Sequence, residues 1–331
     1  MSDPKVSVCI ATYNRARHLR GAIAGVLGQD FAAFELLVSD DASTDATADV
    51  VRSFADARIR YSRNPRNLGL WGNTNQCVSQ ARGEYVLVLQ DDDAMLPGLL
   101  RREVKVLDGS PSAVMVHAAA RRVDENSQPI DEPPQSWPAV TAGLGFVADY
   151  WSGPRCGVVM SSVMFRRSVA ARLGGFNADL LFCADADLWQ RMAFEGQVAF
   201  IPQPLILSRV HSGQVTTQIL LDDGRMLRER LEHAEATRRL LAKQEANLDG
   251  VIRRRLSQYI ASDLTTLRGF GAPLVHVLQY GAMAIRVHPP VLRSVAFFRN
   301  LILAIFPPAV IRRLKDLRSR YWQSHRAANG A

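Results

Sequence analysis

The segment GEYVLVLQDDDAMLP, residues 83–97, decides the fold class. Its apolar run Tyr85–Leu89 has the length and composition of a buried strand, and Asp91, Asp92 and Asp93 follow almost at once. In open α/β sheets, ligands bind beyond the carboxyl ends of the strands. The segment therefore predicts a buried strand of an α/β sheet that delivers three carboxylates to a ligand site.

The regions on either side of this segment extend the same pattern. Apolar runs predict further strands at Val6–Ala11, Phe34–Ser39 and Arg58–Ser62, and helical patterns lie between them near 16–28, 44–55, 71–81 and 98–108. Such a βαβ series predicts a mostly parallel sheet with helices on both faces. Residues 125–138 are polar and proline-rich and predict a long loop. Beyond it the domain continues through the apolar run Val158–Phe165, a helix near 185–195 and an apolar run over 198–207.

Polar residues also follow the first two predicted strands. Tyr13 can stack on a base, and Asp41 can accept hydrogen bonds from its N–H groups. Three adjacent carboxylates repel one another unless a cation neutralises them, and Mg²⁺ or Mn²⁺ takes one or two carboxylates plus phosphate oxygens. These turns predict a divalent-metal site for a nucleoside diphosphate. For the three acids, the alternative is a solvated acidic turn or an N-cap for the helix that starts near Pro97. For the first two turns, the alternative is a satisfied turn with Ser43 or Asp40 as the N-cap of the following helix.

The order of the motifs resembles glycosyltransferase family 2, the inverting enzymes with the GT-A fold. The resemblance covers roughly residues 5–215. It rests on eight motifs in the family's order: VSVCIATYNR, LLVSDDASTDAT, NLGLWGNTN, GEYVLVLQDDDAMLP, SSVMFRR, GGFNADL, ADADLWQRM and RVHSGQVT. What it implies is an α/β fold of GT-A type, Rossmann-like, followed by a C-terminal helical region.

The resemblance also implies roles for single residues. The nucleotide of the donor is expected to lie against five of them: Ala11, Thr12, Tyr13, Asp41 and Asp91. Asp92 matches the metal-binding aspartate, with Asp93 beside it, and His211 matches a position that contacts the metal or the diphosphate. Asp185 matches the catalytic base. Arg209 is a further candidate for stabilising the departing diphosphate.

Two positions depart from the family pattern. Many relatives have an acid where this chain has Gln90, and many have Glu immediately before the base, where this chain has Ala184. Asp187 is therefore the second candidate for the base. Two tryptophans at helical positions, Trp71 and Trp189, are expected in the core. Two serines, Ser161 and Ser162, fit either a donor or acceptor contact or a buried strand end.

Length and composition predict a globular chain of more than one part. The chain has 331 residues, of which 47% are hydrophobic and 22% charged. We expect a transferase domain over 1–221 and a helical region over 222–331. The four cysteines, Cys9, Cys77, Cys156 and Cys183, have no paired spacing, which favours small core residues in a reducing compartment.

The positive charge is concentrated at the C-terminus. Residues 251–331 carry 13 Lys and Arg against 2 Asp and Glu, whereas residues 1–250 carry 27 against 30. Three helix-like segments lie there, Arg253–Arg268, Pro273–Val287 and Val291–Tyr321, and arginines flank their apolar residues. This pattern predicts contact with an anionic membrane surface. Packing on the transferase domain or on a second subunit, as a homo-oligomer, is the alternative.

These observations together predict a metal-dependent inverting glycosyltransferase. It moves a sugar from a nucleotide-sugar donor, UDP-linked with dTDP as the second choice, to the hydroxyl of a saccharide or lipid-linked acceptor. Assembly of cell-surface polysaccharide or glycolipid is the expected setting, in the cytoplasm or at the inner face of the cell membrane, because no secretory signal is visible. A non-catalytic protein that binds nucleotide sugars on the same fold is the alternative. Nucleic-acid binding is not expected, because the sequence contains no recognised nucleic-acid-binding module.

Overall fold

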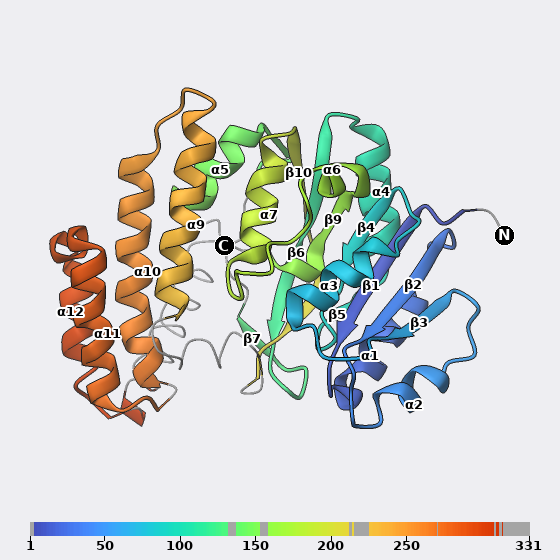
Figure 1. Ribbon diagram of the computed structural model, residues 1–331, viewed down its shortest axis with the longest axis horizontal. Helices are drawn as coiled ribbons and strands as arrows, with labels where there is room; N and C mark the ends of the chain where they lie inside the picture. The colour runs from blue at the N-terminus through green and yellow to red at the C-terminus, as the bar shows by residue number, and fades with distance from the viewer. Residues whose placement is uncertain are drawn as a thin grey trace, which may run out of the picture. The chain divides into compact units, whose positions relative to one another are not determined.

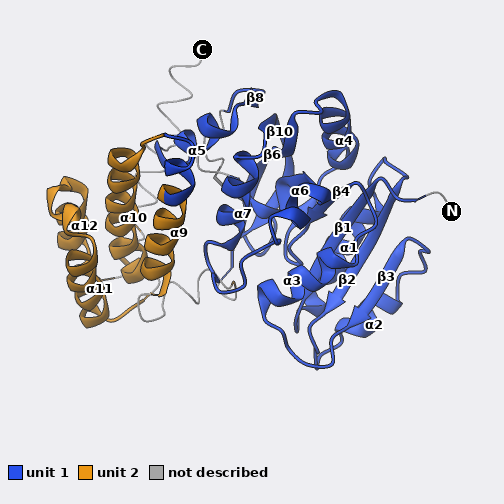
Figure 2. Ribbon diagram, turned by 45° about the horizontal axis from the view of Figure 1, so that its top comes forward, with its two compact units in different colours: residues 1–211, 239–245 blue, residues 212–238, 246–331 orange. Residues whose placement is uncertain are grey.

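The computed structural model describes residues 3–131, 137–152, 158–211, 214, 225–269, 271–307, 309–310 and 313 (Figure 1). The chain divides into two compact units, shown in different colours in Figure 2. Unit 1 comprises residues 1–211 and 239–245, and unit 2 comprises 212–238 and 246–331. The division expected at 221 and 222 falls outside the described residues.

Unit 1 is built on one ten-stranded sheet with β3-β2-β1-β4-β9-β6-β10-β5 as its order. The strands are β1 (Val6–Thr12), β2 (Phe34–Asp40), β3 (Ile59–Arg63), β4 (Tyr85–Val88), β5 (Ala94–Met95), β6 (Ala113–Val123), β7 (Pro129–Asp131), β8 (Val140–Thr141), β9 (Val163–Arg166) and β10 (Gln197–Arg209). The two short strands β7 and β8 pair with β6 and β10 respectively. The α/β fold class is confirmed.

The sheet is parallel as predicted over its first half. β3, β2, β1 and β4 run in one direction, and β10 runs parallel to β6. β9 is antiparallel to both of its neighbours, β4 and β6, and β5 is antiparallel to β10, so the whole sheet is mixed rather than mostly parallel. The stretch 125–138, predicted as a loop, also contains β7. Apolar alternation predicts that a strand exists but carries no signal for its direction.

Helices cover both faces of this sheet. The helical segments of unit 1 are α1 (Ala16–Leu27), α2 (Thr47–Arg52), α3 (Leu70–Ser79), α4 (Leu99–Gly109), α5 (Gly143–Ser152), η1 (Met160–Ser162), α6 (Arg167–Arg172) and α7 (Ala184–Ala193). Val8 and Ile10 of β1 share one hydrophobic core with residues of α1, α2 and α4. Cys9 points to the opposite face because side chains alternate along a strand, and there it interacts with Cys77 of α3. Cys9, Cys77 and Cys183 are buried, as predicted, whereas Cys156 lies outside the described residues.

Unit 2 is a helical assembly joined by buried polar contacts. Its elements are α9 (Arg225–Ala242), of which residues 225–238 belong to this unit, α10 (Asp249–Gly269), α11 (Leu274–Val287), η2 (Pro289–Arg293) and α12 (Val295–Leu303). Asp263 of α10 pairs with Arg230 of α9 and accepts a 2.6 Å hydrogen bond from the Tyr280 hydroxyl of α11. Asn300 of α12 donates to the carbonyl of Ala261 at 2.8 Å. Through the described stretches of chain, no helix has both the length and the apolar character needed to cross a membrane.

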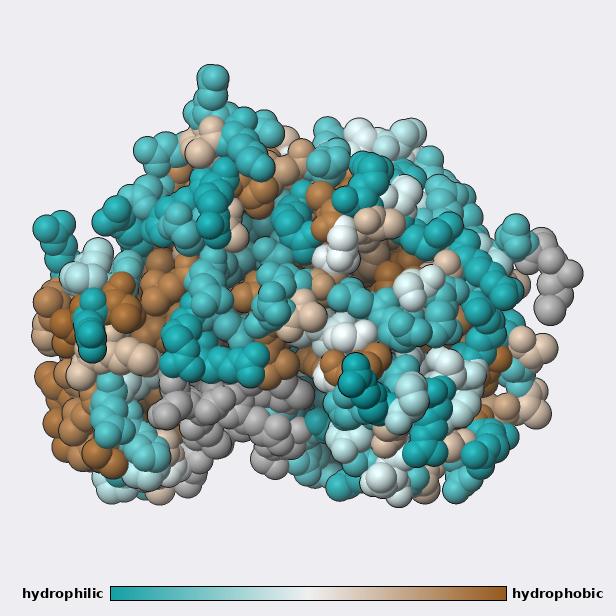
Figure 3. All heavy atoms as spheres, viewed as in Figure 1, coloured by the Kyte–Doolittle hydropathy of each residue, from teal (hydrophilic) through white to brown (hydrophobic). Residues whose placement is uncertain are grey.

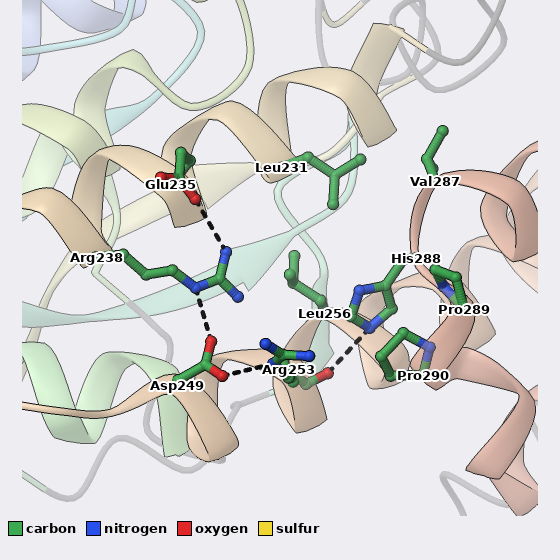
Figure 4. A pocket seen from close by; sticks show the side chains of 10 residues that line it. All are labelled: Leu231, Glu235, Arg238, Asp249, Arg253, Leu256, Val287, His288, Pro289 and Pro290. Atoms are coloured by element: carbon green, nitrogen blue, oxygen red, sulfur yellow. Dashed lines mark hydrogen bonds and ion pairs between the residues drawn. The ribbon is translucent and has the colours of Figure 1, made fainter.

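A cavity of about 340 Å³ lies within unit 2, where α9 meets α10 and η2 (Figure 4). Asp249 accepts hydrogen bonds from Arg238 at 2.8 Å and from Arg253 at 2.6 Å, and Glu235 also faces Arg238. His288 lines the cavity beside them. The two guanidinium charges are thus balanced by two carboxylates, so the network joins α9 to α10 and leaves no net charge for an ionic ligand.

Glu103 of α4 is expected to make the stability of unit 1 depend on pH. Its side chain is fully buried, neither carboxylate oxygen has a partner among the described residues, and burial raises its pKa well above the ordinary value of 4.5. The unfolded chain therefore ionises Glu103 at a lower pH than the folded chain does. We expect Glu103→Gln to have the same free energy of unfolding as the wild type in acid. Above pH 4.5 it should become more stable by about 1.4 kcal/mol per pH unit, until Glu103 ionises in the folded state.

Urea unfolding of the two proteins across this pH range measures the difference. Glu125→Gln removes an exposed carboxylate from the same unit and should leave the wild-type curve unchanged. Parallel curves for wild type and Glu103→Gln would show that the folded state ionises Glu103 without cost.

Candidate active site

The turns that follow β1 and β2 are fastened to each other. The backbone N–H of Asn14 donates to the Ser43 hydroxyl at 2.9 Å, and the N–H of Thr44 donates to Asn14 Oδ1 at 2.7 Å. Asn14 and Ala42 both have left-handed backbone, with φ of 53° and 64°, which is rare for residues other than glycine. The strained turns present Tyr13 and Asp41 at the carboxyl ends of neighbouring strands.

Asp41 is held in place by the segment that leads into α3. Its Oδ1 accepts from Asn64 Nδ2 at 2.9 Å and from the N–H of Leu68 at 2.8 Å, and its Oδ2 accepts from the N–H of Gly69 at 3.0 Å. Gly69 reaches this position with a φ of +77°. A carboxylate has about four acceptor sites, so three protein donors leave room for one N–H of a ligand.

Apolar surface borders this acceptor on both sides. Tyr13 is 47% exposed and Leu68 is 39% exposed, although both are large apolar residues. Leu68 donates its N–H to Asp41, and the N–H of Asp41 donates to the carbonyl of Thr12, next to Tyr13. A flat ring with a polar edge fits such a place. The sequence reasoning assigned Tyr13 here but missed Leu68, although the motif NLGLWGNTN contained it.

The three acids after β4 lie in three different environments. Asp91 Oδ2 accepts from the Thr12 hydroxyl at 2.6 Å. Asp93 is buried, and its two oxygens accept from the Ser161 hydroxyl at 2.6 Å and from the N–H of Arg209 at 2.9 Å. The structure thus joins Thr12 to Asp91, and it joins Asp93 to Ser161, whose side chain is buried with 0% exposure.

Asp92 is the acid with an uncommitted oxygen. Its Oδ2 lies 2.9 Å from His211 Nε2, while its buried Oδ1 has no hydrogen-bond partner among the described residues. An unsatisfied buried oxygen is costly, and a cation is the ligand that suits it. Burial and the charge of Asp92 together raise the pKa of Asp91 to about 7 and that of Asp93 to about 7, so further negative charge is disfavoured here and positive charge is favoured.

This donor set fits Mg²⁺ or Mn²⁺ in the form these ions usually take. Within the described ranges, no three His, Cys, Asp or Glu side chains are grouped so as to enclose a metal ion by themselves. An ion held by one or two protein groups completes its coordination with water and substrate phosphates. Asp92 and His211 therefore suit a metal that arrives with a diphosphate.

Two further side chains support this part of the site. His18 of α1 stacks on His211, with ring centroids 5.1 Å apart, and partial burial lowers the pKa of His18. Arg209 Nε donates to the carbonyl of Asp92 at 3.0 Å, and its Nη1 donates to the carbonyls of Asp124 and Glu125. Arg209 thus supports the backbone that carries the acids.

Asp185 and Asp187, the two candidate bases, differ in their surroundings. Asp185 lies half-buried in the first turn of α7 and accepts from the N–H of Ala186 at 2.7 Å, and burial raises its pKa to about 6. Asp187 is buried and pairs with Arg191 at 2.8 Å. Arg191 also donates to the carbonyls of Leu173 and Gly175, so Asp187 holds a turn in place.

The remaining candidates, two tryptophans and Ser162, have contacts that stabilise the fold. Trp71 and Trp189 are 5% and 2% exposed, as expected of core residues, and Trp71 Nε1 donates to the carbonyl of Leu181 at 2.9 Å. Ser162 donates to the carbonyl of Val159. In the part of the chain that the structure describes, no hydrogen bond or ion pair joins Asp185 to the acids after β4.

A mixed α/β sheet with carboxylates and exposed apolar residues beyond its strand ends is the arrangement found in glycosyltransferases of GT-A fold. The family model described as glycosyl transferase family 2 matches residues 7–174, just over half of the chain. The chain belongs to this family, and it is a glycosyltransferase.

Individual relatives and structures agree with this assignment. The Mycobacterium tuberculosis protein MT1568 is 30% identical over 232 residues, which cover 66% of this chain and 71% of that protein. A Campylobacter jejuni protein named GalNAc(5)-diNAcBac-PP-undecaprenol beta-1,3-glucosyltransferase is 44% identical over 100 residues, 29% of this chain and 32% of that protein.

Two solved structures share the fold. Staphylococcus aureus TarS 1–349 matches with a TM-score of 0.62 at 16% identity, and the match covers 93% of this chain and 91% of the TarS chain. The mannosyltransferase PcManGT from Pyrobaculum calidifontis, in complex with GDP-Man and Mn²⁺, has a TM-score of 0.56 at 20% identity, covering 92% and 87%.

Replacing each candidate base by asparagine should change stability in opposite directions near neutral pH. Asp187→Asn weakens the ion pair with Arg191 and should lower the free energy of unfolding by about 1–3 kcal/mol. Asp185→Asn removes a carboxylate whose pKa is higher in the folded than in the unfolded chain. It should therefore raise stability by about 1–3 kcal/mol at neutral pH, a gain that disappears in acid.

Chemical denaturation at neutral and acidic pH gives both values. A loss of stability in Asp185→Asn at neutral pH would mean that its carboxylate is held by contacts that the structure does not contain.

Proposed function

We propose that this glycosyltransferase is metal-dependent and inverting, and that it moves a sugar from a nucleoside-diphosphate donor to a hydroxyl acceptor. One observation carries the proposal. The buried Asp92 Oδ1 has no partner among the described residues, and it lies between two carboxylates whose pKa values are raised to about 7. This arrangement suits a divalent cation with a diphosphate bound to it.

Donor binding is assigned to the turns after β1 and β2. Tyr13 stacks on the base with Leu68 nearby, Asp41 accepts from a base N–H, and Ala11 and Thr12 line the same pocket. The solved structures of similar fold support a nucleoside-diphosphate sugar as the donor, because TarS 1–349 is solved with UDP and with UDP-GlcNAc, and PcManGT with GDP-Man. A UDP-sugar is the first choice of donor and a dTDP-sugar the second.

Asp92 and His211 hold the metal in this proposal. When bound, the cation supplies positive charge to the diphosphate leaving group. Asp93 was expected as a further ligand, but both of its oxygens already accept hydrogen bonds from the protein. We therefore assign it the positioning of Asp92, together with Arg209, and we assign Asp91 to the nucleotide side through its contact with Thr12.

Asp185 is the catalytic base of the proposed reaction. The acceptor oxygen attacks the anomeric carbon, the bond from that carbon to the diphosphate oxygen breaks, and the hydroxyl proton moves to Asp185. Attack opposite the leaving group inverts the anomeric centre. A base works best when its pKa lies close to the operating pH, and partial burial raises that of Asp185 to about 6.

Cell-surface polysaccharide or glycolipid assembly at the inner face of the cell membrane is the setting that we propose, with a saccharide or lipid-linked acceptor. The name of the Campylobacter relative, which acts on an undecaprenol-linked glycan, supports it. A non-catalytic role is less suited to the site, because a protein that only binds nucleotide sugars has no use for a poised base.

The test is turnover of UDP-, dTDP- and GDP-sugars by the purified protein with Mn²⁺. Asp185→Asn should lower turnover by about 10² to 10⁴-fold while keeping donor affinity, because it removes the proton acceptor alone. Wild-type turnover should rise with pH through about 6 and then level, since the base must be ionised.

Asp187→Asn is the matched control, and it should keep an inflection near pH 6 even where its activity falls. Turnover that is lost in Asp187→Asn and retained in Asp185→Asn would transfer the base to Asp187. No release of nucleoside diphosphate from any donor, with or without acceptors, would favour the non-catalytic alternative.

A further inference from the structure

Unit 2 exposes large apolar side chains along α11, η2 and α12. Figure 3 shows hydrophobic surface gathered over α11 and α12. Val295 is 84% exposed, and Ile302 and Ile305 are each 60% exposed. The whole set, which we call the apolar face, comprises Val275, Leu278, Val287, Leu292, Val295, Phe298, Ile302, Ile305 and Phe306.

The spacing of these residues shows that they form the outer side of each helix. In α12, Val295, Phe298 and Ile302 follow one another at three and four residues, so they share one side. Phe297 and Asn300 lie on the inner side, where Asn300 binds the α10 backbone. An ordinary surface helix carries polar residues on its outer side. α12 is instead apolar on both sides.

α11 repeats this arrangement. Its inner residues Val277, Tyr280 and Ala284 are buried, and a Cβ added at Gly281 would lie 3.7 Å from side-chain carbons of α10 and α12. Its outer side carries Val275 and Leu278 at a three-residue spacing. Both helices therefore pack on α10 through one side and expose apolar residues on the other.

The charges around the apolar face have one sign. Arg286, Arg293 and Arg299 are exposed on the same elements. Between residues 251 and 310 the sequence contains a single acid, Asp263, and it is buried and paired with Arg230. The sequence after α12 adds six cations against one acid: Arg312, Arg313, Lys315, Arg318, Arg320 and Arg326.

The positive charge around the apolar face distinguishes between the partners that could cover it. A second copy of the chain would bring its own arginines against these, so self-association is opposed electrostatically. An anionic lipid surface supplies both the apolar layer and the opposite charge. The cavity of Figure 4 does not serve as a headgroup site, because Asp249 and Glu235 already balance its arginines.

We propose that the apolar face docks on the surface of an anionic bilayer. Val295, Phe298 and Ile302 enter the boundary between headgroups and acyl chains, and Arg286, Arg293 and Arg299 contact lipid phosphates. The surface lies within unit 2 and the proposed chemistry lies within unit 1. The membrane contact and the transfer reaction can therefore be tested separately.

Co-sedimentation of the full chain with vesicles tests the proposal. At low salt the protein should pellet with phosphatidylcholine vesicles that contain phosphatidylglycerol, and at least about tenfold more weakly with phosphatidylcholine alone or at high salt. Val295→Glu/Ile302→Glu should lower the affinity at least about tenfold, because it places two anions on the face. Leu144→Glu makes the same kind of change at an exposed residue of unit 1 and should bind like the wild type.

The triple variant Arg286→Gln/Arg293→Gln/Arg299→Gln isolates the electrostatic contribution to vesicle binding. It should weaken binding and reduce its dependence on salt, while circular dichroism confirms that the helices persist. The proposal is overturned if the wild type fails to pellet with anionic vesicles, or if the glutamate pair binds as well as the wild type. It is also overturned if the wild type is a dimer by light scattering that the glutamate pair dissociates, without any binding to vesicles.

Discussion

Three consecutive carboxylates at the end of β4 are the constraint on which unit 1 depends. Like charges this close cannot all ionise in a buried site unless hydrogen bonds or cations compensate them. The protein compensates them unequally: Asp91 and Asp93 receive hydrogen bonds from hydroxyl and backbone donors, whereas Asp92 keeps one buried oxygen without a partner among the described residues. The adjacent acids therefore have different tasks.

The compensation needs segments that are distant along the chain. Thr12 ends β1, Ser161 lies in η1 before β9, and Arg209 ends β10. In the sheet, β4 lies between β1 and β9, and this order brings Thr12 and Ser161 to the acids. The path of β10 brings Arg209 and His211 to the same place. The mixed direction of the strands is thus part of the site, because an antiparallel β9 places its beginning next to the end of β4.

Sequence reasoning found what lies at strand ends and missed what depends on tertiary contacts. Apolar runs locate strands, and the structure places Tyr13, Asp41 and the three acids just beyond the ends of β1, β2 and β4, where ligands bind in such sheets. The backbone donors of Leu68 and Gly69 to Asp41 had no side-chain signal to find. The pairing of Asp187 with Arg191 did have one, a four-residue spacing on a helix, and it separates the two candidate bases.

Calorimetric titration of UDP, and of GDP, into the protein with Mn²⁺ and then with EDTA measures whether nucleotide binding depends on a metal held by Asp92. We expect nucleotide affinity to fall at least about tenfold when the metal is removed, and Asp92→Asn to bind nucleotide weakly in both conditions. Asp93→Asn should retain most of the response to metal, because Asp93 is assigned to positioning. Equal affinity with and without metal, or a full metal response in Asp92→Asn, would contradict the account.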